Sequence, residues 1–135
     1  MPHSLTAHAH ALDDREAHII DASLRAPTLT PEVALLVAQT FQAVADATRA
    51  RIVYALTRGE HNVNELSVIA GISPSATSHH LKHLRDLRIV TYRREGARVF
   101  YSVDDAHVAA LFREALHHVV HVVYALPDHP DEPSP

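Results

Sequence analysis

The sequence predicts a mainly α (α+β) fold in which a helix-turn-helix is followed by a two-stranded β-hairpin. Apolar residues recur at helical spacing along most of the chain, with capping residues at the segment ends. Residues 89–103 are instead rich in Val, Ile, Tyr, Phe and Thr around Glu95-Gly96, which is typical of a hairpin. With 135 residues, 47% of them hydrophobic and 5% aromatic, we expect one small domain with an aliphatic core.

The N-terminal half contains three predicted helices. Residues 13–25 carry apolar side chains at helical spacing. The second helix starts after Thr30, a good N-cap, with Pro31 in its first position. The third runs from Asp46 to Gly59, which ends it. Residues 1–12 and the Pro-rich residues 127–135 are predicted to be disordered tails, which leaves 13–126 as the domain.

The helix-turn-helix is predicted from a pair of short segments. Residues 63–71 form a brief helix that Gly71 stops, and a turn containing Ser73 and Pro74 leads into a longer helix that ends near Arg88. The next helix runs from residue 104 to 126, where Pro127 ends it.

The longer helix of the pair has two unlike faces. An inward stripe recurs at three- and four-residue spacing, formed by Ala76, Thr77, Leu81, Leu84 and Leu87. The other side is polar near the N-terminal end, where a recognition helix contacts bases and phosphates, and holds Ser75, Ser78, His79 and Lys82.

Charge is distributed unevenly along the chain. The formal net charge is −4, yet residues 75–98 contain six Lys or Arg residues against two acidic ones, a local charge of +4. Three of these cations flank the hairpin turn, namely Arg93, Arg94 and Arg98. A basic hairpin beside a recognition helix is a wing that can reach the flanking DNA backbone or minor groove, so double-stranded DNA is the expected partner.

The chain has no cysteine and 13 histidines. Disulfides, thiolate metal sites and cysteine nucleophiles are therefore excluded, whereas imidazole favours zinc, nickel, cobalt or copper(II). No apolar run approaches the ~20 residues needed to cross a bilayer, and the N-terminus lacks the pattern of a signal peptide. We expect a cytoplasmic protein with no membrane partner.

The segments "VADATRARIVYALTRGEHNVNEL", "SPSATSHHLKHLR" and "YRREGARVFYSV" resemble the ArsR/SmtB family of winged-helix metal-responsive repressors, over roughly residues 31–126. The resemblance implies a winged helix-turn-helix homodimer that binds operator DNA when metal-free and releases it on binding its inducer. It implies no enzyme activity. Asn62 stands where many members carry a metal-binding Cys, which puts arsenite, cadmium or lead sensing through that site in doubt.

The segment "DDAHVAALFREALHHVVH" carries the candidate metal ligands Asp105, His107, His118 and His121. In one helix, His107 and His118 would lie on nearly the same face but ~16 Å apart, so they cannot share an ion. His118 and His121 are helical neighbours, and Asp105 and His107 can pair at the helix start. An antiparallel second chain would complete two intersubunit sites. The resemblance implies the same ligands, because C-terminal-helix sensors carry this spacing.

Zn(II) is the expected inducer, because one carboxylate and three imidazoles make a closed tetrahedral site. A backbone carbonyl near Arg88 is expected to accept the second ring N–H of a metal-bound His and so couple the metal to DNA.

Two alternatives remain open. A nickel or cobalt sensor would recruit extra N-terminal ligands from His3, His8 and His10. In the other, the winged-helix regulator uses its histidines only structurally. A zinc hydrolase is disfavoured, since four protein ligands leave no open coordination position and no catalytic motif is present.

Overall fold

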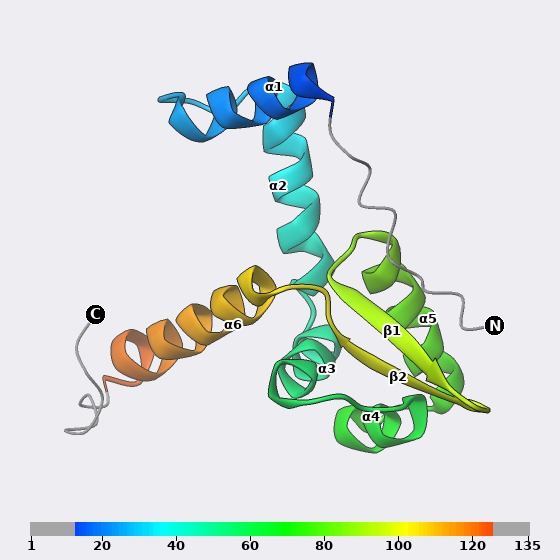
Figure 1. Cartoon of the computed structure of the whole chain (residues 1–135). Helices are drawn as coiled ribbons and strands as arrows, with labels where there is room; N and C mark the ends of the chain where they lie inside the picture. The colour runs from blue at the N-terminus through cyan, green and yellow to red at the C-terminus, as the bar shows by residue number, and fades with distance from the viewer. Residues whose placement is uncertain (1–12, 126–135) are drawn as a thin grey trace. The chain divides into compact units, whose positions relative to one another are not determined.

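The computed structural model describes residues 13–125 of the chain. The chain divides into two compact units, residues 1–46 and 47–135, and each is described by itself. The first contains α1 (Asp14–Arg25) and α2 (Pro31–Val44), shown in blue and cyan in Figure 1. As predicted, the Thr30 hydroxyl caps α2 by accepting the Val33 N–H at 3.3 Å, and Pro31 follows in the first turn.

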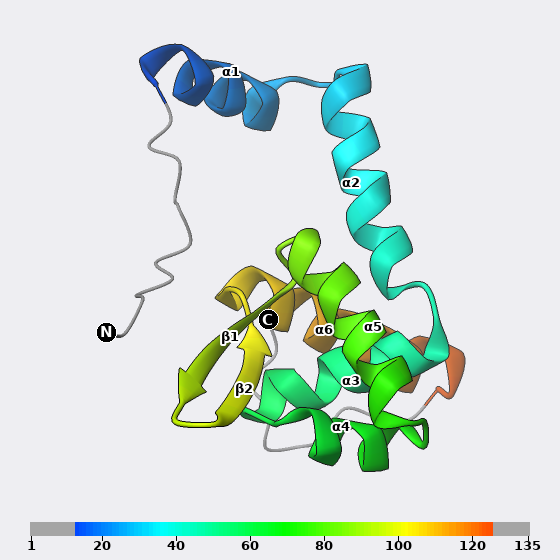
Figure 2. The same cartoon turned by 90° about the vertical axis from the view of Figure 1, so that its right-hand side faces the viewer.

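The second unit holds the remaining elements (Figures 1 and 2). In chain order these are α3 (Ala47–Arg58), α4 (Val63–Ala70), α5 (Pro74–Asp86), β1 (Val90–Glu95), β2 (Arg98–Val103), α6 (Ala106–His118) and the π-helical turn η1 (Val119–Val123). The predicted helix-turn-helix is α4 and α5, and the predicted wing is the β1–β2 hairpin. The described part of the chain contains no helix with the length and apolarity to span a membrane.

An aliphatic core forms where α3, α4, α5 and the base of the hairpin meet. Its fully buried side chains come from all four elements and include Ile52, Val53, Leu66, Leu81, Leu84 and Val90. The predicted inward stripe of α5 is present, since Thr77, Leu81 and Leu84 are buried while Ala76 and Leu87 are half-buried. This packing fixes which face of α5 remains exposed.

The hairpin is a two-stranded antiparallel sheet whose register runs from Val90 opposite Val103 to Glu95 opposite Arg98. Its turn is Gly96-Ala97, one residue later than the predicted Glu95-Gly96. Gly96 has φ +60°, a conformation that glycine adopts at little cost, so pairing extends through Glu95 before the chain reverses. In both views the turn projects away from the helices (Figures 1 and 2).

The last helix differs from the prediction at both ends. Asp105 is the N-cap, so α6 begins at Ala106 rather than at residue 104. Regular α-helix stops at His118, and the chain continues as a π-helical turn to Val123. A π-helix hydrogen-bonds i to i+5, so its wider turn changes which side chains lie above one another.

Candidate DNA-binding and metal-binding sites

The outer face of α5 presents the predicted recognition residues. Gly71, with φ +69°, ends α4 in the left-handed conformation, and the Ser73 hydroxyl caps α5 by accepting the Ala76 N–H at 3.1 Å. The four predicted DNA contacts, Ser75, Ser78, His79 and Lys82, are all exposed. Because the opposite stripe is buried, these side chains project from the protein near the N-terminal end of α5.

Asn62 has a local structural role that was not predicted from the sequence. Its side chain accepts the Glu65 N–H at 2.9 Å, and the Glu65 carboxylate returns to the Asn62 N–H at 3.4 Å, which makes a capping box for α4. The signal was readable in the sequence as Asn-x-x-Glu before an apolar residue. Glu65 also lies 3.0 Å from His61 Nδ1. The hydrogen bond from His61, followed by that from Asn62, holds the pKa of Glu65 below its usual value.

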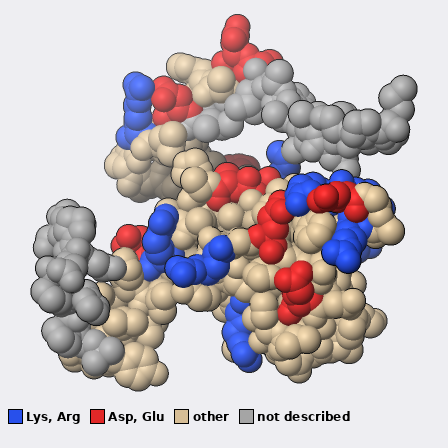
Figure 3. Space-filling model, turned by 60° about the horizontal axis from the view of Figure 1, so that its bottom comes forward, with Lys and Arg blue, Asp and Glu red and all other residues tan. Residues whose placement is uncertain are grey.

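The arginines of the wing differ in their surroundings. All three are exposed, and they differ in their contacts. Arg93 makes a bidentate ion pair with Glu60 and a further bond with Glu95, and its guanidinium lies over the Phe100 ring. On the side of the hairpin, Figure 3 shows basic side chains gathered around carboxylates. The Arg93 bond lowers the pKa of Glu60, and Glu60 and Glu95 together raise the pKa of Arg93.

The start of α6 holds the first pair of predicted metal ligands. Asp105 Oδ1 accepts the N–H groups of His107 at 2.8 Å and Val108 at 3.1 Å. The second carboxylate oxygen takes no part in this capping and is available to a cation. The His107 side chain is 97% exposed, with Nδ1 3.5 Å from Asp105 Oδ1. Both groups therefore face outward at one end of the helix.

The C-terminal end of α6 and the π-turn η1 that follows it hold three histidines. His118 is exposed and ends the α-helix, whereas His121 lies in the π-turn. The His121 ring lies against the His117 ring, with centroids 5.8 Å apart. His117 is therefore a neighbour of a predicted ligand.

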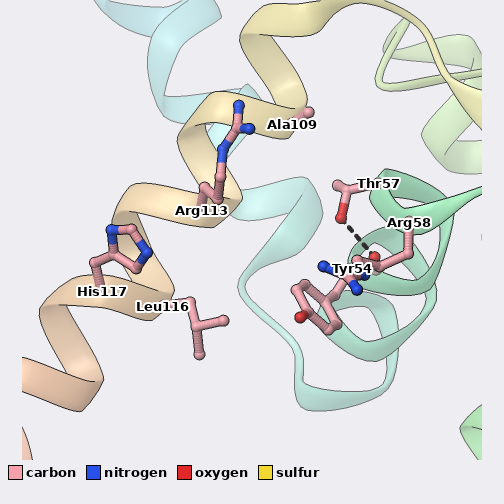
Figure 4. Close-up of a pocket in the computed structure, with 7 residues that line it drawn as sticks. All are labelled: Tyr54, Thr57, Arg58, Ala109, Arg113, Leu116 and His117. Atoms are coloured by element: carbon pink, nitrogen blue, oxygen red, sulfur yellow. Dashed lines mark hydrogen bonds between the residues drawn. The ribbon is translucent and has the colours of Figure 1, made fainter. Parts of the chain in front are cut away.

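His117 also lines a pocket of about 260 Å³ between α3 and α6. Figure 4 shows Arg113 and Leu116 of α6 with Tyr54, Thr57 and Arg58 of α3, and Leu116 pointing toward Tyr54. The Thr57 hydroxyl donates to the Tyr54 carbonyl oxygen at 2.6 Å. His117 is half-buried here, in contrast to the exposed His118.

The four predicted ligands do not come together within one chain. Among residues 13–125, no three His, Asp or Glu side chains are arranged to hold a metal ion. Two donors lie at the start of α6 and two at its end, separated by about 16 Å of helix. Imidazole nitrogen and carboxylate oxygen are ligands that Zn(II), Ni(II) and Co(II) accept, so the residue types fit such an ion. His3, His8 and His10 lie outside the described residues.

Backbone hydrogen bonds connect the start of α6 with the end of α5. The Asp104 N–H donates to the Ile89 carbonyl oxygen at 3.0 Å, and the Ile89 N–H donates to the Leu84 carbonyl oxygen at 2.9 Å. Leu84 lies in the last turn of α5, and Arg88, between the two, has a φ of 58°. The candidate ligand Asp105 is thus one residue from a chain of bonds that ends on the candidate recognition helix.

Comparison with known proteins identifies relatives of this chain. Residues 46–92 match the model of the family described as bacterial regulatory protein, arsR family. The transcriptional regulator NmtR of Mycobacterium tuberculosis is 40% identical over 103 residues, covering 76% of this chain and 86% of that protein.

This chain belongs to the arsR family of bacterial regulatory proteins.

Other arsR-family relatives agree. The transcriptional repressor SmtB homolog of Synechocystis is 45% identical over 82 residues, which span 61% of this chain and 62% of that repressor. A cadmium resistance transcriptional regulatory protein, the CadC homolog of Staphylococcus aureus, is 43% identical over 83 residues, 61% of this chain and 69% of that one. Membership in this family confirms the prediction of a regulatory protein rather than an enzyme.

The predicted fold is confirmed as well. The homodimeric winged helix-turn-helix DNA-binding domain of a possible ArsR-family regulator from Mycobacterium bovis superposes with a TM-score of 0.64 at 25% identity, covering 88% of this chain and 97% of that one. This arsR-family chain is a DNA-binding regulator with α4 and α5 as its helix-turn-helix and the β1–β2 hairpin as its wing.

Proposed function

We propose that this chain is a homodimeric, metal-responsive transcriptional repressor that binds operator DNA when metal-free and releases it on binding Zn(II). The observation that carries the proposal is the division of donors along α6. Asp105 and the 97%-exposed His107 face outward at one end, and His118 and His121 lie at the other. Each pair is half of a tetrahedral set, so two antiparallel copies of α6 complete two sites.

Apolar side chains on α6 and η1 support a second copy as the partner. Leu116, Val119, Val122 and Val123 are between 40% and 65% exposed in the single chain. Exposed aliphatic residues in a contiguous helical segment mark a protein interface. The segment that carries the metal donors is therefore also one whose exposed apolar side chains would become buried when two copies pair.

Each metal site would hold Asp105 and His107 of one subunit together with His118 and His121 of the other. A bound ion would cross-link the two subunits, and Asp105 would help to hold it while remaining the N-cap of the turn that follows Asp104. The Asp104–Ile89–Leu84 hydrogen bonds offer a path from that turn to α5. Metal shifts DNA affinity only insofar as it binds one arrangement of the dimer better.

The partner DNA would be contacted by Ser75, Ser78, His79 and Lys82 of α5 and by the wing. Serine and histidine can read base edges, and Lys82 can neutralise a phosphate. A bacterial operator lies in the cytoplasm, which is the proposed location.

The identity of the inducing metal is tested by a gel shift on DNA upstream of the chain's own gene, without metal and with Zn(II), Ni(II) or Co(II). We expect Zn(II) to release the DNA at the lowest concentration. The optical spectrum of the Co(II)-bound protein reports how many ligands surround the ion. Intense d–d bands indicate four ligands. Weak bands indicate six, as expected for a nickel or cobalt sensor that also uses His3, His8 and His10. Tight Zn(II) binding with unchanged DNA affinity would contradict the repressor mechanism.

One observation favours the alternative in which the histidines are structural. The contact between the His117 and His121 rings occupies part of the proposed ligand set within one chain. In that case His118→Ala leaves the affinity for Zn(II) intact, and the inducer is not a metal.

A further inference from the structure

We propose that Arg93 is a positioning residue for DNA binding, which holds the wing on the body of the domain through Glu60 instead of contacting DNA itself. The inference rests on the proposed contacts between the wing and DNA. It separates the three wing arginines into one clamp, Arg93, and two candidate phosphate ligands, Arg94 and Arg98.

Each nitrogen of the Arg93 guanidinium already donates to a carboxylate. Its Nε lies 2.8 Å from Glu60 Oε1 and 3.1 Å from Oε2, and Nη2 lies 2.9 Å from Oε2. Its Nη1 donates to Glu95 Oε2 at 2.8 Å. The guanidinium carbon Cζ lies over the Phe100 ring, 4.8 Å from its centre, and Phe100 is the cross-strand neighbour of Arg93. All three nitrogens therefore have carboxylate partners, and the guanidinium also lies over an aromatic ring.

The charge of this cluster is wrong for a phosphate ligand. One guanidinium is matched with two carboxylates, Glu60 and Glu95, so these three side chains together carry a charge of −1, and Arg98 lies opposite Glu95 in the hairpin register. A phosphate approaching Arg93 would be repelled by both carboxylates and would have to replace a bidentate pair. Arg94 follows Arg93 along the strand, and alternation directs it to the opposite face of the hairpin.

Glu60 lies in the connection between α3 and α4, so its ion pair with Arg93 attaches the wing to that connection. Asn62, two residues later, caps α4, the first helix of the helix-turn-helix. A second tie lies beside the first: His61 and Tyr101 exchange backbone hydrogen bonds of 3.2 Å and 2.8 Å. Arg93 thus joins strand β1 to the segment that sets α4, while the His61 bridge joins β2 to it. Two attachments on two strands define the angle of the wing.

An isolated exposed ion pair contributes little, and half of the Arg93 side chain is exposed. The clamp is therefore expected to affect where the wing points more than whether the domain folds. This distinction supplies the test, because a positioning role and a phosphate contact predict opposite effects of removing Glu60.

The test uses the full-length chain and a duplex that the wild-type protein selects from random sequence, with affinity measured across a range of salt concentrations. The variants are Glu60→Gln, Arg93→Ala and the exchanged pair Glu60→Arg with Arg93→Glu. Arg98→Ala is the matched control for a phosphate contact, expected to reduce the salt slope by about 0.9.

We expect Glu60→Gln to weaken DNA binding roughly fivefold, although it removes a negative charge from the protein. Arg93→Ala should weaken binding to a similar degree with the salt slope unchanged, and the exchanged pair should restore most of the affinity. Tighter binding by Glu60→Gln, or a salt slope reduced by about 0.9 in Arg93→Ala, would overturn the clamp in favour of a phosphate contact.

Two controls keep the result decisive. Thermal unfolding of each variant shows whether it is folded, and if Arg93→Ala is not, Glu60→Gln and the exchanged pair decide the question. Failure of the wild-type chain to select any duplex would contradict the proposed function itself, an outcome distinct from wild-type binding with tighter Glu60→Gln.

Discussion

Asp105 Oδ1 accepts the backbone N–H of His107 at 2.8 Å, so one proposed metal ligand holds the helical turn that carries the other. The capping bonds use a single oxygen, and the negative charge of the group stays available at the second. Capping and metal binding by Asp105 can therefore be separated by substitution.

Asp105→Asn should retain the cap and lose the charged ligand. Asn caps helices about as well as Asp, so the stability of the metal-free protein should change little, whereas the affinity for Zn(II) should fall at least about tenfold. Asp105→Ala removes both functions and should also cost about 1 kcal/mol of stability. Thermal unfolding and zinc titration with a competing chelator measure the two effects. Equal zinc affinity in wild type and Asp105→Asn would remove Asp105 from the site.

Adjacent histidines on α6 should differ in their importance for the metal. His118→Ala should reduce the affinity for Zn(II) by about 100-fold or more, because a direct ligand matters more than an outer contact. His117→Ala is the matched control, since His117 faces the pocket beside α3 and should leave the affinity within about threefold. The reverse order would assign the ligand role to His117, whose ring lies against His121.

Lys82 should contribute charge rather than sequence preference. Lys82→Ala is expected to weaken binding to all duplexes by a similar factor and to reduce the salt slope by about 0.9. Ser78→Ala, on the same exposed face, should leave the slope unchanged and alter the preferred sequence. Filter binding at several salt concentrations distinguishes them, and an unchanged slope in Lys82→Ala would exclude a phosphate contact.

Glu60 should titrate below its ordinary pKa of 4.5, because the bond from Arg93 favours the charged carboxylate. A lowered pKa means that the pair stabilises the folded state above about pH 4.5 and that this contribution is lost as the pH falls through the lower value. Carboxyl NMR should show the Glu60 midpoint return toward 4.5 in Arg93→Ala. Glu65 is the internal control, since its lowered pKa depends on His61 and Asn62. A Glu60 midpoint that Arg93→Ala leaves unchanged would contradict the clamp.

Local signals predicted most of the fold. Thr30 and Ser73 cap the helices that their positions indicate, and Gly71 ends α4 in the left-handed conformation. These features depend on neighbours within a few residues, so they are readable along the chain. The hairpin turn was predicted one residue early, because Gly96 suits either position of a two-residue turn and only the pairing of Glu95 with Arg98 decides between them.

Long-range and backbone features were not predictable in the same way. The pair formed by Arg93 and Glu60 joins residues 33 positions apart, and nothing in the local sequence of Arg93 distinguishes it from Arg94. The π-turn at Val119–Val123 contains no proline or glycine that would predict it, and it holds His121, whose ring lies against that of His117. The metal ligands were predicted from spacing and resemblance, and their assembly from two chains stays a prediction.

The separation of the metal donors along α6 has a consequence for dimers that contain two different subunits. A subunit with Asp105→Ala and His107→Ala still offers the far pair, and a subunit with His118→Ala and His121→Ala still offers the near pair. Neither variant alone can build a complete site, but a mixed dimer regains one. Two non-responsive proteins, refolded together, should therefore recover zinc binding, which a zinc titration of the mixture measures. Recovery would demonstrate complementation between subunits, whereas its absence would place the site within a single chain.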